Sequence, residues 1–598
     1  MDLTVLSQTG GKGESVIRLL KNRIDLIGVP FTDRGSRLLV LRQGMSLQIR
    51  MAERWYKRDP ALSAYRKRVP ILHDFYFTDA EGRRLDFQLE SYPDILEFRT
   101  PVGTFRLAYE DMETFYLSLP EVACGICFDV EVDQGQTDRR GGVLRLTGDI
   151  RRNIAYTTNR KLLVNHLQVL SREQIRVNLV FDKGPEKGML LNITPRLGFN
   201  RYMPDEEEVF AAAARRWEEW FAAVPPVAEA FRSQYYYAWW IMRAGLASPR
   251  FFTTRESLMP SKMYYVGVWQ WDAYFHALAY RHVNPLLARD QIRIFLDHQR
   301  PDGMIPDAIH DEGTITHLTI PIEGDVTKPP LVSWAVWKLF ETDGDLEFLR
   351  EVYEPLVRWN NWWFEHNDVD GDGLCEYLHP YSSGLDDNPL WDEGMPVTSP
   401  ELNTYLVIQM ECLSRIAHAL GLEEEAVRWE KKAQSLTAKM VNYLWDEKAG
   451  LFWALHDGKR VPTVTPFNLY PLITGRLPSE MARRLIDHLT NPQEFWTRYP
   501  IPTVARNDPK FDPWQMWRGP TWININFLLI EGLERAGFMS LAAELRLKTL
   551  ELMMGQGDIF EYYNPDTGEP GPKAAPVFGW SAALFIELAI QASERMRV

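Results

Sequence analysis

The sequence predicts an N-terminal antiparallel β-sandwich followed by an all-α domain with an (α/α)6 barrel. The period of the apolar residues changes from two to about 3.6 near residue 216. Twenty of the 21 tryptophans lie beyond that point, and only Trp55 precedes it. A chain of 598 residues also exceeds what one hydrophobic core usually supports. We therefore assign residues 1–203 to the sandwich, 204–226 to a helical linker and 227–598 to the barrel.

Alternating apolar residues predict the strands of the first domain. Apolar side chains occupy every second position from Ile175 to Phe181, and VLRLT at 143–147 repeats the pattern. Turn sequences such as TPVGT at 100–104 separate these runs, which is typical of a sandwich. Acidic residues at 205–208 then favour the start of a linker helix that runs to Phe221.

Helical periodicity dominates the rest of the chain. Apolar residues from Leu406 to Leu420 share one helix face, with Pro400 near its start and Gly421 as the expected C-terminal cap. About twelve such segments follow one another, at 227–247, 270–282, 286–299, 329–343, 345–367, 400–420, 422–445, 464–474, 478–490, 520–536, 538–555 and 577–596. Twelve helices without strands predict six α-hairpins in a toroid whose mouth is built from loops.

The composition excludes several classes of function. The formal net charge of −14 argues against nucleic acid or an anionic membrane as the main partner, because either requires a basic face. The sequence has no apolar run of about 18 residues and no apolar stretch in its first 17, so we expect a cytoplasmic protein. Cys124 and Cys127 lead into a strand-like segment without a second ligand pair, so we expect them to be structural. The oligomeric state stays open.

Three loops combine aromatic and acidic residues. GVWQWD at 267–272 places Trp269 and Trp271 beside Asp272, and such rings can pack on a sugar while the carboxylate binds its hydroxyls. Core packing is the alternative for any single tryptophan. YSSGLDDNPLWDEG at 381–394 carries the adjacent Asp386 and Asp387, which would otherwise form a solvated acidic turn.

The third loop, GDIFEYYNPDTGEPG at 557–571, places Glu561 among aromatic residues. Partial desolvation raises the pKa of a carboxyl group and suits proton transfer near neutral pH. Glycoside hydrolysis requires two carboxylates on opposite sides of the anomeric carbon. Asp386 and Glu561 lie about 175 positions apart, and a toroid that converges its loops could bring them together.

The helical region resembles glycoside hydrolase family 63, which includes processing α-glucosidases and bacterial α-glycosidases and is related to the trehalases. The matching segments are VWQWDAYF at 268–275, QRPDGMIPD at 299–307, SGLDDNP at 383–389, MWRGPTWININ at 516–526, FEYYNPDTG at 560–568 and FGWS at 578–581. The resemblance implies an (α/α)6 barrel, often behind a β-sandwich. It also implies an inverting enzyme with Asp386 as general acid and Glu561 as general base, and catalysis without a cofactor.

The same resemblance implies a set of substrate-binding residues: Trp269, Trp271, Asp272, Trp517, Arg518 and Trp522. We expect Asp387 and Trp391 to bind the substrate as well, and Asp387 to raise the pKa of the neighbouring acid. Residues 388–391, which end in Trp391, replace a Tyr-Pro-Arg-like stretch of eukaryotic members, and this loop is expected to face the leaving group. The aglycone and the glycosidic linkage therefore stay open.

The expected substrate is a carbohydrate, an α-glucoside by resemblance, with a mannosyl or glucosyl derivative of glycerate as the alternative. Glycerate would require a basic or hydroxyl-rich loop, for which Arg518 and residues 314–317 are candidates. A glycoside phosphorylase would need a basic phosphate cluster, and Arg518 alone is a candidate for one. A non-catalytic glycan-binding protein would not need both acids.

A calcium-loop pattern lies at 367–377. Asp368, Asp370 and Asp372 occupy positions 1, 3 and 5 of the pattern, and Leu374 would offer its carbonyl. Glu376 would add a carboxylate, although the EF-hand glutamate at position 12 is missing. We expect a structural calcium ion, the alternative being an acidic turn without an ion.

The predicted N-terminal domain carries no loop that combines carboxylates with aromatic residues. We therefore expect it to supply no catalytic acid or base and to cover one face of the barrel. Removing residues 1–200 should expose a large apolar surface.

Overall fold

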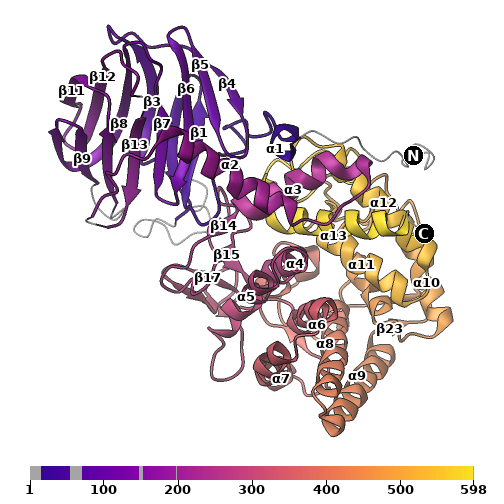
Figure 1. Cartoon of the computed structure of the whole chain (residues 1–598). Coiled ribbons are helices and arrows are strands. Elements are labelled where there is room, and N and C mark those ends of the chain that lie inside the picture. Colours follow the sequence, from indigo (N-terminus) through magenta and orange to yellow (C-terminus); the bar gives the residue numbers. More distant parts are fainter. Residues whose placement is uncertain (1–14, 54–69, 147–151, 187, 197, 597–598) are drawn as a thin grey trace.

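A computed structural model describes residues 15–53, 70–146, 152–186, 188–196 and 198–596. Figure 1 shows the indigo and purple strands of the N-terminal part gathered at one end of the molecule, while the magenta to yellow helices form the rest. Trp55 lies outside the described residues. Within the described ranges, no helix is both long and apolar enough to cross a membrane.

The N-terminal part is a large antiparallel sheet of 13 strands. Its strands are β1 (Leu38–Gln43), β2 (Ser46–Met51), β3 (Leu72–Asp79), β4 (Gln88–Ser91), β5 (Leu96–Thr100), β6 (Gly103–Asp111), β7 (Thr114–Ser118), β8 (Cys124–Asp138), β9 (Gly141–Leu146), β10 (Asn153–Thr158), β11 (Leu162–Val169), β12 (Gln174–Phe181) and β13 (Gly188–Thr194). The order is β1-β2-β3-β8-β9-β10-β13-β7-β6-β5-β4, and β12 joins β11 to β8. The predicted alternation holds in β12, where Val177, Leu179 and Phe181 are buried.

The long strand β8 links two portions of this sheet. Its first half pairs with β3 and β12, whereas its second half pairs with β9, with a register shift between Val132 and Gln134. Side chains from the two portions meet in the core. Phe77 of β3 stacks on Phe105 of β6, with ring centroids 4.2 Å apart. Cys124 and Cys127 of β8 are buried free thiols.

A capped helix connects the sheet to the helical region. The carboxylate of Asp205 accepts hydrogen bonds from the backbone N–H groups of Glu207 and Glu208, which begins α2 (Glu206–Ala222). Three glutamates in its first turn complement the helix dipole, as the sequence predicted. A short helix, α1 (Val16–Leu19), contacts α2.

The helical region contains helices at all twelve predicted positions. They are α3 (Arg232–Ala244), α4 (Gln270–Tyr280), α5 (Pro285–Leu296), α6 (Val332–Asp343), α7 (Leu346–His366), α8 (Pro400–Ala419), α9 (Glu423–Leu444), η7 (Pro466–Thr474), α10 (Ser479–Leu489), α11 (Ile523–Arg535), α12 (Met539–Met554) and α13 (Gly579–Arg595). The eighth segment corrects the prediction, because η7 is a 3-10 helix. Pro471 inside it has no N–H for α-helical hydrogen bonding.

Six of these elements form a closed ring. Contacts run from α4 to α6, α8, η7, α11 and α13, and α13 contacts α4 again. The other elements each contact a member of the ring: α5 packs on α4, α7 on α6, α9 on α8, α10 on η7, α12 on α11 and α3 on α13. Five of the six pairs therefore join helices that are adjacent in sequence, and the sixth joins α3 to α13, the first and the last of the twelve (Figure 1).

The expectation of helices without strands was wrong. Short antiparallel pairings of two or three residues order the connecting loops: β14 (Leu246–Ala247), β15 (Ser257–Leu258), β16 (Val268–Trp269), β17 (Ala308–His310), β18 (Gly313–Ile315), β19 (His317–Leu318), β20 (Gly324–Asp325), β21 (Glu376–Tyr377), β22 (Val397–Thr398), β23 (Trp445–Asp446), β24 (Leu451–Phe452), β25 (Leu455–His456) and β26 (Lys459–Arg460). Three further 3-10 turns occur, η4 (Glu229–Phe231), η5 (Pro380–Ser383) and η6 (Pro389–Trp391). Runs this short leave no clear period in a sequence.

Candidate active site

The Asp386 loop is shaped by packing against an aromatic ring. Gly384 ends η5 with φ +73°, and a Cβ atom there would lie 2.3 Å from the ring of Trp271. Only glycine suits both the left-handed backbone and this close approach. Asn388 follows the two aspartates and donates through its side chain to the carbonyl of Trp517 at 2.9 Å. The loop is therefore held on both sides of Asp386.

Asp386 itself is half-buried. Burial, together with the charges of Asp307 and Asp387, raises the pKa of its carboxyl group to about 7, against the opposing influence of the Lys328 ammonium. A carboxyl group with this pKa carries a proton at neutral pH in a substantial fraction of molecules. That state is the one required of a proton donor.

Glu561 is buried, and both of its carboxylate oxygens are fixed. Oε1 accepts a 2.8 Å hydrogen bond from the hydroxyl of Tyr265, and Oε2 accepts one of 3.1 Å from the backbone N–H of Ala575. The backbone of Glu561 also donates to the carbonyl of Ala575 at 2.9 Å. Donors on both oxygens fix the orientation of the carboxyl group. A general base needs a fixed orientation to act on one water molecule.

Electrostatic contacts join the two acids into one cluster. Asp272 lies in the first turn of α4, and burial raises the pKa of its carboxyl group well above the ordinary value. The ammonium of Lys328 lowers that pKa, whereas the charge of Glu561 raises it. Lys328 acts on Asp386 as well. The structure thus brings Asp272, Asp386 and Glu561 together from three distant parts of the sequence.

Most of the predicted pocket tryptophans form a buried stack. Trp517 and Trp522 lie parallel with centroids 3.6 Å apart, and Trp271 lies 6.1 Å from Trp517. None of the three exposes more than 2% of its surface. Trp522 also stacks on Tyr562, the neighbour of Glu561. These rings therefore connect the loops that carry the acids, and their contact with substrate stays a prediction.

Trp269 and Trp391 make contacts with other residues. Trp269 is half-buried and meets the ring of Tyr265 edge-on at 5.7 Å. The indole N–H of Trp391 donates to the carbonyl of Leu385 at 2.9 Å, which ties the ring to the Asp386 loop. Trp269 is the more open of the two to a ligand.

Asp387 and Arg518 belong to a polar network beside the acid. Asp387 accepts from the backbone N–H of Trp517 at 2.8 Å, and Arg518 donates to the backbone carbonyl of Asp387 at 3.1 Å. Two further N–H groups of Arg518 bind both carboxylate oxygens of Asp392, at 2.9 and 2.8 Å. The guanidinium is therefore engaged by a carboxylate, which disfavours it as a free phosphate site.

The sequence did not single out three residues of this cluster: Tyr265, Asp307 and Lys328. Asp307 closes the QRPDGMIPD segment, and its charge acts on both Asp272 and Asp386. Lys328 forms an ion pair with Asp307. A lone lysine before two prolines carries no signal of burial, whereas Asp307 could have been found as the last residue of a quoted motif.

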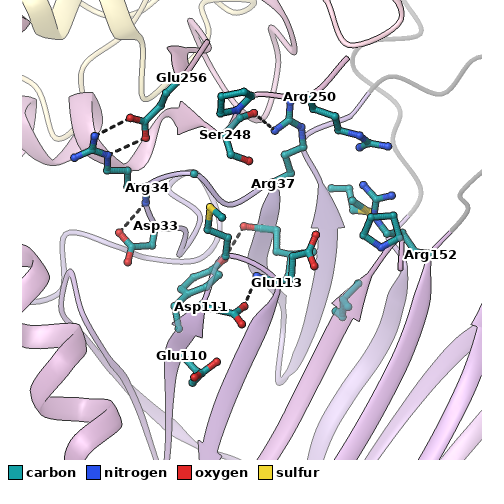
Figure 2. A pocket seen from close by; sticks show the side chains of 18 of the residues that line it. Asp33, Arg34, Arg37, Glu110, Asp111, Glu113, Arg152, Ser248, Arg250 and Glu256 are labelled. Carbon is teal, nitrogen blue, oxygen red and sulfur yellow. Dashed lines mark hydrogen bonds and ion pairs between the residues drawn. The ribbon is translucent and has the colours of Figure 1, made fainter. Parts of the chain in front are cut away.

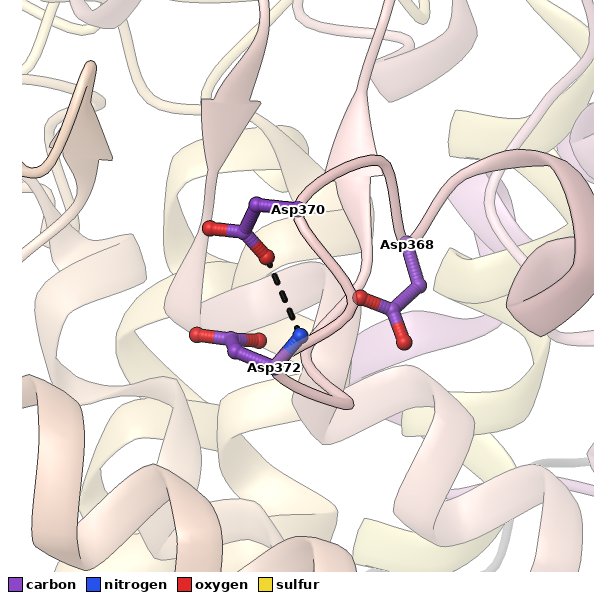
Figure 3. A group of neighbouring side chains, drawn as sticks. All are labelled: Asp368, Asp370 and Asp372. Atoms are coloured by element: carbon purple, nitrogen blue, oxygen red, sulfur yellow. Dashed lines mark hydrogen bonds between the residues drawn. The ribbon is translucent and has the colours of Figure 1, made fainter.

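The predicted calcium loop lies apart from these residues in sequence. Asp368, Asp370 and Asp372 offer carboxylate oxygens within 4.8 Å of one another. Figure 3 shows the three side chains on one loop. Among the described residues, Glu376 is not part of that group. It is buried, and its Oε2 accepts from the backbone N–H of Val369 at 2.9 Å. Leu374 is buried and donates its own N–H to Asp372 at 2.7 Å.

A cavity of about 850 Å³ lies where the sheet meets the helical region. Figure 2 shows charged residues of both signs around it, including the pair of Arg34 with Glu256. None of the predicted site residues lines this cavity. Residues of both regions line it, and ion pairs such as that of Arg243 with Asp33 join them, so we assign the cavity to the junction between the two regions rather than to the acid cluster.

Comparison with known proteins identifies the family. The family model described as the mannosylglycerate hydrolase MGH1-like glycoside hydrolase domain matches residues 265–581, just over half of the chain. The chain belongs to these family 63 glycoside hydrolases. It is therefore a glycoside hydrolase, and the matched range contains Asp272, Asp386 and Glu561.

Individual relatives agree with this assignment. The mannosylglycerate hydrolase of Thermus thermophilus is 27% identical over 54% of this chain and 95% of its own length. A crystal structure of the mannosylglycerate hydrolase from Thermus thermophilus in complex with glucose covers 57% of this chain and 97% of its own, with 25% identity and a TM-score of 0.50. A bacterial glucoamylase complexed with acarbose covers 98% of this chain and 96% of its own, with a TM-score of 0.59 and 13% identity, and shows the fold alone.

Proposed function

We propose that this glycoside hydrolase is an inverting α-glycosidase with Asp386 as general acid and Glu561 as general base. The observation that carries the proposal is the contrast between the two groups. Asp386 has a pKa of about 7 and can hold a proton, whereas Glu561 is a carboxyl group oriented by two hydrogen-bond donors. One group is suited to give a proton and the other to take one.

The proposed reaction is a single displacement. Asp386 donates its proton to the glycosidic oxygen as the bond to the anomeric carbon breaks. Glu561 accepts a proton from a water molecule that attacks the opposite face of the sugar. The two carboxyl groups must then stand roughly 6.5–9.5 Å apart to leave room for that water. Asp272 interacts electrostatically with Glu561 and, like Asp386, with Lys328. Its carboxyl group would bind hydroxyl groups of the sugar.

We also propose that the two regions are a β-sandwich and an (α/α)6 barrel. The stacking of Phe77 on Phe105 across the two portions of the sheet supports the first assignment. The closed ring of contacts through α4, α6, α8, η7, α11 and α13 supports the second. The likeness in fold to bacterial glucoamylase, which extends over nearly the whole chain, agrees with both.

The sugar and the aglycone are proposed from two sources. The sequence motifs favour an α-glucoside. The family model and the Thermus thermophilus relative, both named for mannosylglycerate hydrolysis, favour a mannosyl derivative of glycerate as the second candidate. A screen of α-linked disaccharides against α-mannosyl- and α-glucosylglycerate, with released monosaccharide as the readout, decides between them. Release that requires added phosphate would instead indicate a phosphorylase.

The roles of the two acids are tested with leaving groups of different basicity. Asp386→Asn should lose roughly 10²–10⁴-fold in kcat on an alkyl glycoside, because the alkoxide must be protonated as it leaves. On a glycosyl fluoride, which needs little proton donation, the loss should be much smaller. Glu561→Gln should lose activity on both substrates. Asp558→Asn, which alters a buried carboxyl group three positions from Glu561, is the matched control and should retain activity on both. Equal losses for Asp386→Asn on the two substrates would contradict its role as acid.

We further propose a calcium ion bound by Asp368, Asp370 and Asp372. The donor set fits, since carboxylate oxygens are the ligands that calcium prefers, and the three side chains converge from one loop. Backbone N–H groups within the loop, such as that of Gly373 on Asp368, hold its turn. The ion would stabilise the exit from α7 and take no part in the reaction.

A further inference from the structure

Lys328 occupies a buried position between β20 and α6. Its side chain is only 6% exposed. The ammonium forms an ion pair with Asp307 and donates a 2.7 Å hydrogen bond to the backbone carbonyl of Tyr381. Tyr381 belongs to η5, five residues before Asp386. A buried ammonium is retained only where charged and hydrogen-bonding partners compensate for its lost hydration.

The residue before Lys328 secures the same junction. The hydroxyl of Thr327 lies 2.7 Å from the carbonyl oxygen of Ile305 and 3.1 Å from the side-chain oxygen of Gln270. Its backbone N–H donates to the hydroxyl of Ser382 at 3.2 Å. Residues 327–328 therefore join three loops, the one that begins α4, the one that carries Asp307 and the one that carries Asp386. A shift of Lys328 would disturb all three.

Lys328 also provides a positive charge to the acidic cluster. It acts on Asp307, Asp386 and Asp272. The negative charge of Asp387 raises the pKa of Asp386, and that of Glu561 raises the pKa of Asp272. From the η5 side, Tyr381 faces Asp386, and burial together with Lys328 lowers the pKa of the His379 imidazole to about 4. His379 is therefore neutral at working pH, and Lys328 carries the compensating charge.

We infer that Lys328 is a positioning residue for the proton donor, because its ammonium ties the Asp386 loop to Asp307 and sets the charge balance under which Asp386 gives up its proton. This inference rests on the proposed role of Asp386. Lys328 does not transfer the proton itself. Its charge favours the ionised form of Asp386, and Asp307 partly cancels that influence.

Because Lys328 and Asp307 carry opposite charges, replacing each of them should shift the pH profile of the enzyme in opposite directions. Activity should fall on the alkaline side of the profile of kcat/KM as Asp386 loses its proton. Lys328→Met removes the positive charge, so the alkaline limb should move to higher pH by roughly one unit or more. Asp307→Asn leaves Lys328 uncompensated, so the same limb should move to lower pH. A residue that only maintained the fold would reduce the rate at every pH without moving the limb in either direction.

The experiment measures kcat/KM from pH 5 to 9 on the preferred glycoside for the full-length wild type and each variant. Lys338→Met is the control, because Lys338 is a half-buried lysine on α6 paired with Glu531 at 2.7 Å. The alkaline limb of the Lys338→Met profile should coincide with that of the wild type. Lys328→Arg keeps the positive charge, so its alkaline limb should stay near the position found in the wild type. Circular dichroism verifies the fold of each variant.

The outcomes separate this inference from the proposed function. Opposite displacements in Lys328→Met and Asp307→Asn support the inference. Unmoved limbs in both variants, with Asp386→Asn inactive, would overturn it and leave the proposed function intact. Substantial alkyl-glycosidase activity in Asp386→Asn would overturn the proposed function itself. If Lys328→Met does not fold, Asp307→Asn decides alone, since a downward displacement supports the inference and an unmoved limb contradicts it.

Discussion

The hydroxyl of Tyr265 donates a 2.8 Å hydrogen bond to Oε1 of Glu561. Three residues earlier, the buried ammonium of Lys262 binds the hydroxyl of Thr32 and the backbone carbonyl of Asp33, which precede the first strand of the sheet. The N-terminal region thus contacts the segment that orients Glu561. The N-terminal region can in this way support the geometry of the active site.

Replacing Tyr265 with phenylalanine should lower kcat by about 10-fold, because Glu561 would lose the hydroxyl donor on Oε1 and with it part of its orientation. The thermal midpoint should change little, since the ring and its contact with Trp269 remain. Tyr264→Phe is the neighbouring control and should retain full activity. Steady-state kinetics on the preferred glycoside tests this prediction, and an unaltered kcat in Tyr265→Phe would show that the hydrogen bond has no part in orienting the base.

The raised pKa of Asp386, about 7, predicts a cost in stability. A carboxyl group whose pKa is raised in the folded state stabilises the fold at low pH, and this contribution is lost as the pH rises through the folded pKa. Asp386→Asn cannot ionise and should therefore melt at a higher temperature than the wild type at pH 8, with the difference diminishing toward pH 5. Thermal melts at pH 5, 6, 7 and 8 test this. A difference in melting temperature that grows toward low pH would contradict the raised pKa of Asp386.

The motifs predicted the loops of the site better than the roles of single residues. Asp386 and Glu561 were identified because their loops combine carboxylates with aromatics, and the structure places both in one charge cluster. Trp517 and Trp522 were assigned to the pocket by the family resemblance; they lie stacked and buried, and their contact with substrate stays a prediction. An aromatic residue in a glycine-containing loop suits either place, and only tertiary packing decides which. Lys328 illustrates the converse. Its role comes from its burial among residues that are distant in sequence, and no local sequence pattern marks it.

The calcium proposal predicts a stabilisation that depends on the ion. Treatment of the full chain with a chelator should lower the thermal midpoint, and added calcium should restore it, because an ion that binds only the folded state shifts the folding equilibrium. Asp370→Asn should reduce both the response and the amount of calcium found by elemental analysis. Activity at low temperature should persist without the ion. A protein that contains no calcium and shows no change in melting would contradict the proposal.

The junction between the sheet and the helical region should contribute strongly to stability. Arg37 is buried and binds both carboxylate oxygens of Asp311, at 3.1 and 2.6 Å. Arg37→Met should therefore lower the free energy of unfolding by about 3 kcal/mol, because it leaves the half-buried carboxylate of Asp311 without its main partner. Arg34→Met, which breaks the more exposed pair with Glu256, should have a smaller effect. Urea denaturation measures both, and equal losses would contradict the importance of burial at Arg37.

The larger organisation was predictable because long periodic segments specify their own structure. Pro400 at the start of α8 and Gly421 just beyond its end, with φ +77°, are as the sequence predicted. The short pairings between helices were not predictable, since two or three residues show no period. They nevertheless position the site, because β16 pairs with β17 immediately before Asp272 enters α4.

The stereochemistry of the product tests the central claim most directly. Proton NMR spectra recorded in the first minutes of the wild-type reaction distinguish the two anomers of the released sugar before mutarotation mixes them. With Asp386 as acid and Glu561 activating water on the opposite face, the β-anomer should appear first from an α-glycoside. The α-anomer appearing first would indicate a covalent glycosyl-enzyme intermediate, and the assignment of Glu561 as general base would have to be abandoned.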